Sequence, residues 1–169
     1  MNLSIRRTVR SLLVAVVSCA FAAAGARAQQ TCGQFSLSPH GKVDLFAGYV
    51  PAFESGDALP TAGVFAMKLR PAIRVIYAYK SDNDHNSGSG GVVTIESIRP
   101  GRHRIALSGD AQVDAVQGNS LLHLLAVARD PECPGVDRSV EFVSEGGPLT
   151  IQISGARASL ITIAVFRLP

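Results

Sequence analysis

The feature that most constrains the fold of this sequence is an alternation of apolar and polar residues with a period of two. Apolar side chains stand at every second position in residues 65–70, 102–107, 140–142 and 149–154, and a similar pattern runs through residues 74–80. Successive side chains of a β-strand point to opposite faces, so this period is typical of strands that bury one face. The sequence therefore predicts a chain built of half-buried strands.

Clusters of Gly, Pro, Ser and Asn separate these runs, for example at residues 87–91, 100–101 and 146–148. Gly supplies positive φ and Pro a fixed φ, which suits tight turns between strands. About eight to ten strands at a spacing of roughly 8–12 residues are typical of an antiparallel sandwich or barrel. We expect an all-β fold, an antiparallel β-sandwich of the jelly-roll or a related type. Residues 160–168, apolar on both faces, should form a central strand.

Residues 120–129 (SLLHLLAVAR) fit two structures. Their leucines and alanines favour a short helix, whereas their position between Asn119 and Pro131, among segments that alternate like strands, favours a strand. We expect a strand here, with the helix as the alternative.

The N-terminus has the layout of a cleavable export signal. Three arginines in the first ten residues precede an apolar run, residues 12–24, and a small-x-small cleavage site follows at Ala28. The run is shorter than the roughly 20 residues that a membrane span requires, so we expect no transmembrane anchor. We predict a signal peptide over residues 1–28, cleaved near Ala28, and a single β-sandwich domain over residues 29–169 that is periplasmic or secreted.

The cysteines predict one disulfide in that compartment. Cys32 and Cys133 remain after cleavage, and an oxidising compartment favours a bridge between them. In the chain-entropy model, closing so long a loop contributes as much as ~4–5 kcal/mol. A redox-active pair would sit in Cys-x-x-Cys, which the sequence lacks. Cys19 defines a lipoprotein alternative, in which that residue is lipidated and becomes the mature N-terminus.

The basic charge of the whole chain belongs to the export signal. Four of the 16 Lys and Arg residues lie within residues 1–28, which contain none of the 13 Asp and Glu residues, so the mature chain carries a formal net charge of −1. Binding to nucleic acid requires a basic surface. We therefore expect no nucleic acid among the partners.

Five segments in the second half of the chain follow a recognisable pattern: GRHRIALS at 101–108, VDAVQ at 113–117, CPG at 133–135, RSVEF at 138–142 and GPLTIQISG at 147–155. In these segments the chain resembles a family of small exported bacterial proteins that are rich in β-structure. The resemblance implies export and a β fold, and it carries no established activity.

Some members of that family bear the name homogentisate dioxygenase, which the residues of this chain do not support. Such an enzyme holds ferrous iron with two histidines and a carboxylate, and cupin-type versions bring two of these ligands together in His-x-His. Here Ile105 stands where the second histidine would follow His103, and no Glu follows at the required spacing. We expect no iron site on this strand.

The most polar loop holds the candidate metal ligands. Asp82, Asp84 and Asn86 stand at alternate positions, as in a D-x-D-x-N calcium loop. However, Ser87 replaces the Gly of a helix-loop-helix calcium site, and Val93 stands where its bidentate Glu belongs. We expect a solvated loop between two strands, with calcium binding as the alternative.

The four histidines, His40, His85, His103 and His123, show no pair at metal-ligand spacing, and the sequence lacks Gly-x-Ser-x-Gly and His-Glu-x-x-His. These observations favour an exported, non-catalytic β-sandwich that acts as a binding or envelope-accessory module. We predict no cofactor; the sequence does not identify the partner, for which an envelope protein and a glycan are the candidates. Two alternatives remain: a calcium-dependent module that binds carbohydrate or peptide, and a metal-dependent enzyme with dispersed histidine ligands.

Overall fold

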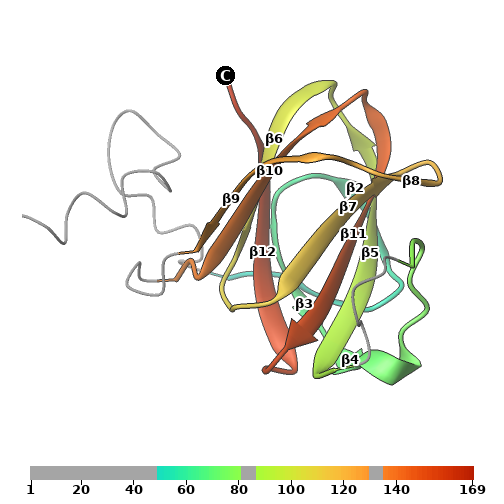
Figure 1. Cartoon of the computed structure of the whole chain (residues 1–169), viewed down its shortest axis with the longest axis vertical. Coiled ribbons are helices and arrows are strands. Elements are labelled where there is room, and N and C mark those ends of the chain that lie inside the picture. The colour runs from blue at the N-terminus through green and yellow to red at the C-terminus, as the bar shows by residue number, and fades with distance from the viewer. Residues whose placement is uncertain (1–48, 81–86, 130–134) are drawn as a thin grey trace, which may run out of the picture. The chain divides into compact units, whose positions relative to one another are not determined.

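The computed structural model describes residues 49–80, 87–129 and 135–169. Within these residues the chain forms twelve strands, one turn of 3-10 helix (η2, Ala72–Arg74) and no α-helix. The strands make two sheets of six strands each (Figure 1). The prediction of an all-β fold is confirmed. The twelve strands exceed the predicted eight to ten, because some are short strands that no alternating run in the sequence marks.

The first sheet places β12 near its centre. From edge to edge the order is β1 (Ala52–Glu54), β3 (Val64–Lys68), β12 (Leu160–Arg167), β6 (Gly101–Leu107), β10 (Arg138–Ser144) and β9 (Leu124–Arg129). The central position of β12 agrees with the apolar character of residues 160–168.

The second sheet is built around two ten-residue strands that pair antiparallel, β5 and β11. The order is β2 (Ala58–Thr61), β5 (Ser89–Ile98), β11 (Gly147–Ala156), β7 (Gln112–Gln117) and β8 (Ser120–Leu121), and β4 (Arg70–Pro71) also pairs with β5.

The prediction of antiparallel pairing throughout is wrong at two places. β1 pairs parallel with β3, and β2 pairs parallel with β5. Two parallel strands need a connection that carries the chain back before the second strand begins. Here each connection passes through the other sheet, because β2 follows β1 before β3, and β3 follows β2 before β5. Both sheets are therefore mixed.

One hydrophobic core takes side chains from both sheets. The first sheet contributes Phe65, Ile105 and Phe142, and the second contributes Val93 and Ile151, all almost completely buried. Burying an aliphatic or aromatic side chain of this size contributes roughly 1.5–3 kcal/mol. The alternating apolar positions of the sequence are the ones that point into this core.

Residues 75–80 alternate in sequence like a strand but do not form one. They lie on the outer face of the second sheet, where the buried amide of Gln152 bonds to the backbone of Tyr79. The Tyr79 N–H donates to Gln152 Oε1 at 2.7 Å, and Gln152 Nε2 donates to the Tyr79 carbonyl at 3.0 Å. Tyr77 Oη lies over Gly90, where an added Cβ would come within 2.1 Å of it. The alternation of residues 75–80 therefore results from packing against a sheet and not from hydrogen bonding within one.

The strand interpretation of residues 120–129 is confirmed, with the difference that they form two strands. β8 belongs to the second sheet and β9 to the first, and Leu122 and His123 connect them. The chain therefore passes from one sheet to the other within this segment.

Several sequence predictions fall outside the described residues: the signal peptide over residues 1–28, Cys19, the calcium candidates Asp82, Asp84 and Asn86, and the cysteines Cys32 and Cys133. The structure thus gives no support to the predicted disulfide. In the described part of the chain, no helix has the length and apolar character needed to cross a membrane.

Candidate functional site

His103 is a core residue, not an open metal ligand. Its buried ring stacks on Phe142 with centroids 5.8 Å apart, and its Nδ1 lies 2.9 Å from the Gly101 carbonyl oxygen. Burial lowers the pKa of His103, and the nearby charge of Arg167 lowers it further, against the opposing effect of the Gly101 carbonyl. These contacts favour a neutral ring that packs against its neighbours.

The other histidines do not join His103. His123 is exposed in the link between β8 and β9, whereas His40 and His85 lie outside the described residues. Across residues 49–80, 87–129 and 135–169, no three His, Cys, Asp or Glu side chains gather in a group that could hold a metal ion.

The edges of the two sheets differ in their protection. β1 has three residues, β8 has two, and β2 carries Pro60 among its four. β9 has six residues, contains neither Pro nor an acidic residue, and pairs with β10 alone among the described strands. Soluble proteins protect sheet edges with short strands, prolines and charges. β9 has none of these before its last residue, Arg129.

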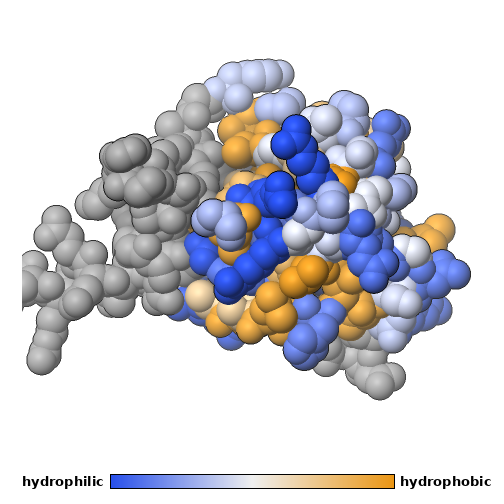
Figure 2. All heavy atoms as spheres, turned by 90° about the horizontal axis from the view of Figure 1, so that it is seen from above, coloured by the Kyte–Doolittle hydropathy of each residue, from blue (hydrophilic) through white to orange (hydrophobic). Residues whose placement is uncertain are grey.

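Exposed aliphatic side chains lie along this edge. Leu125 is 50% exposed and Val127 is 52% exposed, and Leu121 of β8 is also exposed. The register between β9 and β10 shifts between Glu141 and Phe142, so that Leu125 is the extra residue of a β-bulge. Hydrophobic patches also interrupt the hydrophilic surface at the end of the molecule shown in Figure 2. We call strand β9, with Leu121, Leu125 and Val127, the β9 edge.

The β9 edge ends at a cluster of charges. Arg129, the last residue of β9, lies opposite Arg138, the first residue of β10. Like charges directly opposite each other on neighbouring strands are destabilising. Asp110, in the turn between β6 and β7, lies near both arginines: its Oδ1 is 3.4 Å from Arg129 Nε and 3.8 Å from Arg138 Nη1. This exposed carboxylate offsets the repulsion in part.

Arg138 has fewer partners than its burial requires. Its side chain is 12% exposed, and its Nε is buried without a hydrogen-bond partner. The 3.8 Å separation from Asp110 exceeds hydrogen-bond length. Burial lowers the pKa of Arg138, and Arg129 lowers it further, against Asp110 and Asp114, which raise it. A further anion at this position would stabilise the guanidinium.

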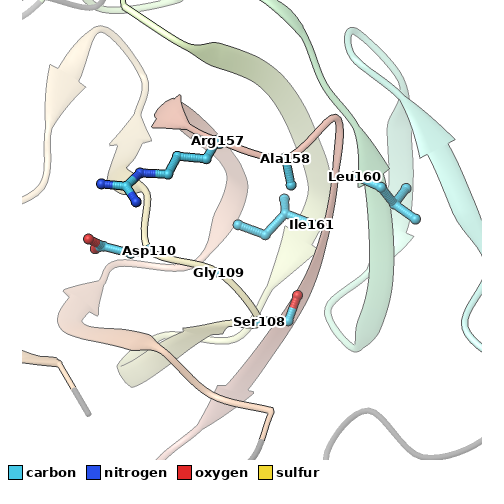
Figure 3. Close-up of a pocket in the computed structure, with 8 residues that line it drawn as sticks. Ser108, Gly109, Asp110, Arg157, Ala158, Leu160 and Ile161 are labelled. Atoms are coloured by element: carbon cyan, nitrogen blue, oxygen red, sulfur yellow. The ribbon is translucent and has the colours of Figure 1, made fainter. Parts of the chain in front are cut away.

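A hollow of about 220 Å³ opens beside Asp110. The β6–β7 turn lines it with Ser108, Gly109 and Asp110, the β11–β12 turn with Arg157 and Ala158, and β12 with Ile161. In Figure 3 the guanidinium of Arg157 and the carboxylate of Asp110 lie on one side of the hollow, and the apolar side chains of Ala158 and Ile161 lie on the other. We call this feature the Asp110 hollow.

One hydroxyl group and two ionisable side chains are the polar side chains that line the Asp110 hollow. Its one hydroxyl group, on Ser108, accepts a hydrogen bond from the Thr162 N–H at 2.9 Å, which ties the β6–β7 turn to β12. The ionisable groups that line it are a carboxylate and a guanidinium, which can hold a charged ligand in place.

Sequence reasoning did not single out the residues of this cluster. Arg129 and Arg138 flank the turn-forming residues 131–135, so a hairpin reading of that segment would have placed them opposite each other. No comparable signal marks Asp110 or Arg157, which reach the cluster through distant turns.

No protein-family model, no curated protein and no solved structure matches this chain. The resemblance to small exported proteins therefore stays an expectation from sequence, and function has to be argued from the geometry of these surfaces.

Proposed function

We propose that the mature chain is an exported, non-catalytic β-sandwich of the jelly-roll or a related type, which acts as an accessory module by binding another protein through the β9 edge. The observation that carries this proposal is a six-residue edge strand without proline or acidic residues, flanked by exposed aliphatic side chains.

An edge strand presents a row of backbone N–H and C=O groups on its unpaired side. An extended segment of a partner can add to such an edge, with affinity from main-chain hydrogen bonds and specificity from alternate side chains. Leu125 and Val127 supply apolar contact at the same place. Each is about half exposed, so about half of the roughly 1.5–3 kcal/mol for a fully buried side chain remains to be gained on binding.

Two other observations support the remaining parts of the proposal, which are the sandwich fold and export. A shared core between two sheets supports the sandwich, and the N-terminal sequence supports export. The calcium-dependent and metal-enzyme alternatives rest on sequence alone, because no contact among the described residues favours either.

The experiment that tests the proposal is site-specific photocrosslinking in the cell that makes and exports the protein. A photoreactive amino acid replaces Leu125, Val127 or Val143 in separate full-length variants. Val143 is the matched control, since it is an aliphatic residue of β10 with 51% exposure that lies outside the β9 edge.

We expect one discrete protein adduct from positions 125 and 127 and none from position 143. The added substitution Leu121→Lys should reduce the yield of that adduct without changing the melting temperature. Equal adducts from all three positions, or no adduct from positions 125 and 127, would contradict the proposal.

A further inference from the structure

We propose that the Asp110 hollow, together with Arg129 and Arg138, binds the C-terminal carboxylate of an extended peptide segment that lies along the β9 edge. The peptide identity of the ligand rests on the proposed function, whereas carboxylate binding rests on the charges and contacts at the hollow alone.

Among the described residues around the hollow, guanidinium groups outnumber carboxylates. Three guanidinium groups, from Arg129, Arg138 and Arg157, lie near the carboxylate of Asp110, and the carboxylate of Asp114 is the other one that acts on Arg138. The structure records no ion pair between Arg157 and another described residue. An excess of positive charge beside a hollow attracts an anion and raises its local concentration.

Arg138 shows where the anion is needed most. Its Nε is buried without a hydrogen-bond partner, and its Nη1 stays 3.8 Å from Asp110. The planar guanidinium presents paired N–H groups in a fork that matches a carboxylate. A ligand carboxylate that reaches Arg138 beside Asp110 would supply the acceptor that Asp110 does not.

The lining of the hollow favours a carboxylate over a phosphate. Asp110 lies within 4 Å of two of the arginines and repels a doubly charged phosphate more strongly than a singly charged carboxylate. Ala158 and Ile161 offer apolar contact to a carbon skeleton. The volume of about 220 Å³ is below the roughly 300–1,000 Å³ of pockets for drug-sized ligands, so it suits one terminal residue.

Continuity with β9 favours a peptide over an acidic sugar. Arg129 is both the last residue of β9 and an ion-pair partner of Asp110. A segment that adds to β9 by main-chain hydrogen bonds can therefore end beside the three arginines, as in domains that combine strand addition with capture of a C-terminal carboxylate.

The test uses N-acetylglycine as the smallest mimic of a peptide terminus, added to the full mature chain labelled with nitrogen-15. The Nε–Hε resonances of Arg129 and Arg138 report binding directly. N-acetylglycinamide, which lacks the charge, galacturonate and inorganic phosphate serve as the comparison ligands.

We expect N-acetylglycine to shift these resonances saturably, and the three comparison ligands to bind at least tenfold more weakly. Arg157→Gln should weaken binding of N-acetylglycine about tenfold, because it removes a charge-assisted hydrogen bond. Asp110→Asn should strengthen it about threefold, because it removes a competing negative charge. The control Arg99→Gln changes an exposed arginine in the turn at the other end of β6 and should leave binding unchanged.

Absence of a saturable shift, equal binding of the amide, tighter binding of phosphate or galacturonate, or weaker binding in Asp110→Asn would overturn this proposal. Arg157 and Asp110 are exposed, so the test does not depend on whether an Arg138 variant folds. If N-acetylglycine does not bind but position 127 forms the protein adduct, the proposed function stands. Saturable binding of N-acetylglycine without those adducts would overturn the proposed function and retain the carboxylate site.

Discussion

The charged cluster on the outer face of the first sheet allows a stability prediction with a stated magnitude. Glu141 of β10 lies opposite Arg104 of β6. Its Oε1 accepts hydrogen bonds from Arg104 Nε, at 3.0 Å, and Nη2, and its Oε2 accepts them from Arg102 Nε, at 2.9 Å, and Nη2. Glu141 is 7% exposed, Arg104 is 16% exposed and Arg102 is 53% exposed. The pair with Arg104 is thus nearly buried, and the pair with Arg102 is half in solvent.

Glu141→Gln keeps the shape of the side chain and removes its charge. Removing one partner of a buried ion pair costs about 3–5 kcal/mol, whereas an exposed pair contributes only about 0–1 kcal/mol. Because the amide keeps one acceptor oxygen for Arg104, we expect a loss at the lower end, about 3 kcal/mol. For a chain of this size that corresponds to a fall of about 10 °C in melting temperature.

Urea unfolding at pH 7 measures this loss, with Glu96→Gln on β5 as the matched control. Glu96 is an exposed carboxylate for which the structure records no ion pair with a described residue. We expect the control to change the free energy of unfolding by less than about 0.5 kcal/mol. A loss below about 1 kcal/mol in Glu141→Gln, or an equal loss in both variants, would refute the reasoning.

The same ion pairs predict a dependence on pH. Burial raises the pKa of Glu141, but hydrogen bonds and charges from Arg104 and Arg102 lower it by more, so the folded value falls below the ordinary 4.5. A carboxylate with a depressed folded pKa stabilises fully above the unfolded pKa and loses that contribution as pH falls through the folded value. The difference between wild type and Glu141→Gln should therefore shrink as pH falls below 4.5. A difference that stays constant down to pH 2.5 would show that the ion pairs are not its source.

Three further predictions concern other parts of the chain. Gln152→Ala removes two hydrogen bonds to the Tyr79 backbone, so it should cost about 2 kcal/mol and speed hydrogen exchange at the Tyr79 amide; unchanged exchange would contradict the role assigned to Gln152. Burial lowers the pKa of His103, so its contribution to stability should be complete above about pH 6.5 and be lost as pH falls below that value; an NMR titration midpoint at or above 6.5 would contradict this. In the exported protein, non-reducing peptide mapping should find Cys32 bonded to Cys133, and free thiols at both positions would exclude the bridge.

Sequence patterns predicted the parts of the fold that depend on local periodicity. In a strand with a period of two, either of two faces can be buried, and the apolar positions show which one it is. Ile105 on β6 and Ile151 on β11 point into the core for this reason. The central position of β12 follows from the same argument, since a strand that is apolar on both faces is favoured between two neighbours.

Features that depend on distant partners could not be predicted in this way. Alternation does not say which sheet a strand joins, so the parallel pairs of β1 with β3 and of β2 with β5 left no signal. Tyr77 and Tyr79 alternate with exposed residues because they pack on Gly90 and Gln152, which the second sheet provides. A periodicity caused by packing on a sheet looks the same in sequence as one caused by pairing within it.

Buried polar groups at the two ends of the described fold differ in their hydrogen bonding, and this difference supports the proposed carboxylate site at the Asp110 hollow. At the end away from the hollow, Gln117 secures the β10–β11 turn: its Nε2 donates to the Gly146 carbonyl, and its Oε1 accepts from the Glu145 N–H at 3.1 Å. At the hollow, Arg138 Nε lacks a partner, the one such atom among buried side-chain nitrogens and oxygens of the described residues. Native proteins satisfy nearly all such groups, and an exception calls for a cause. In the proposed complex the ligand carboxylate supplies this acceptor, and the new hydrogen bond becomes part of the affinity for the ligand.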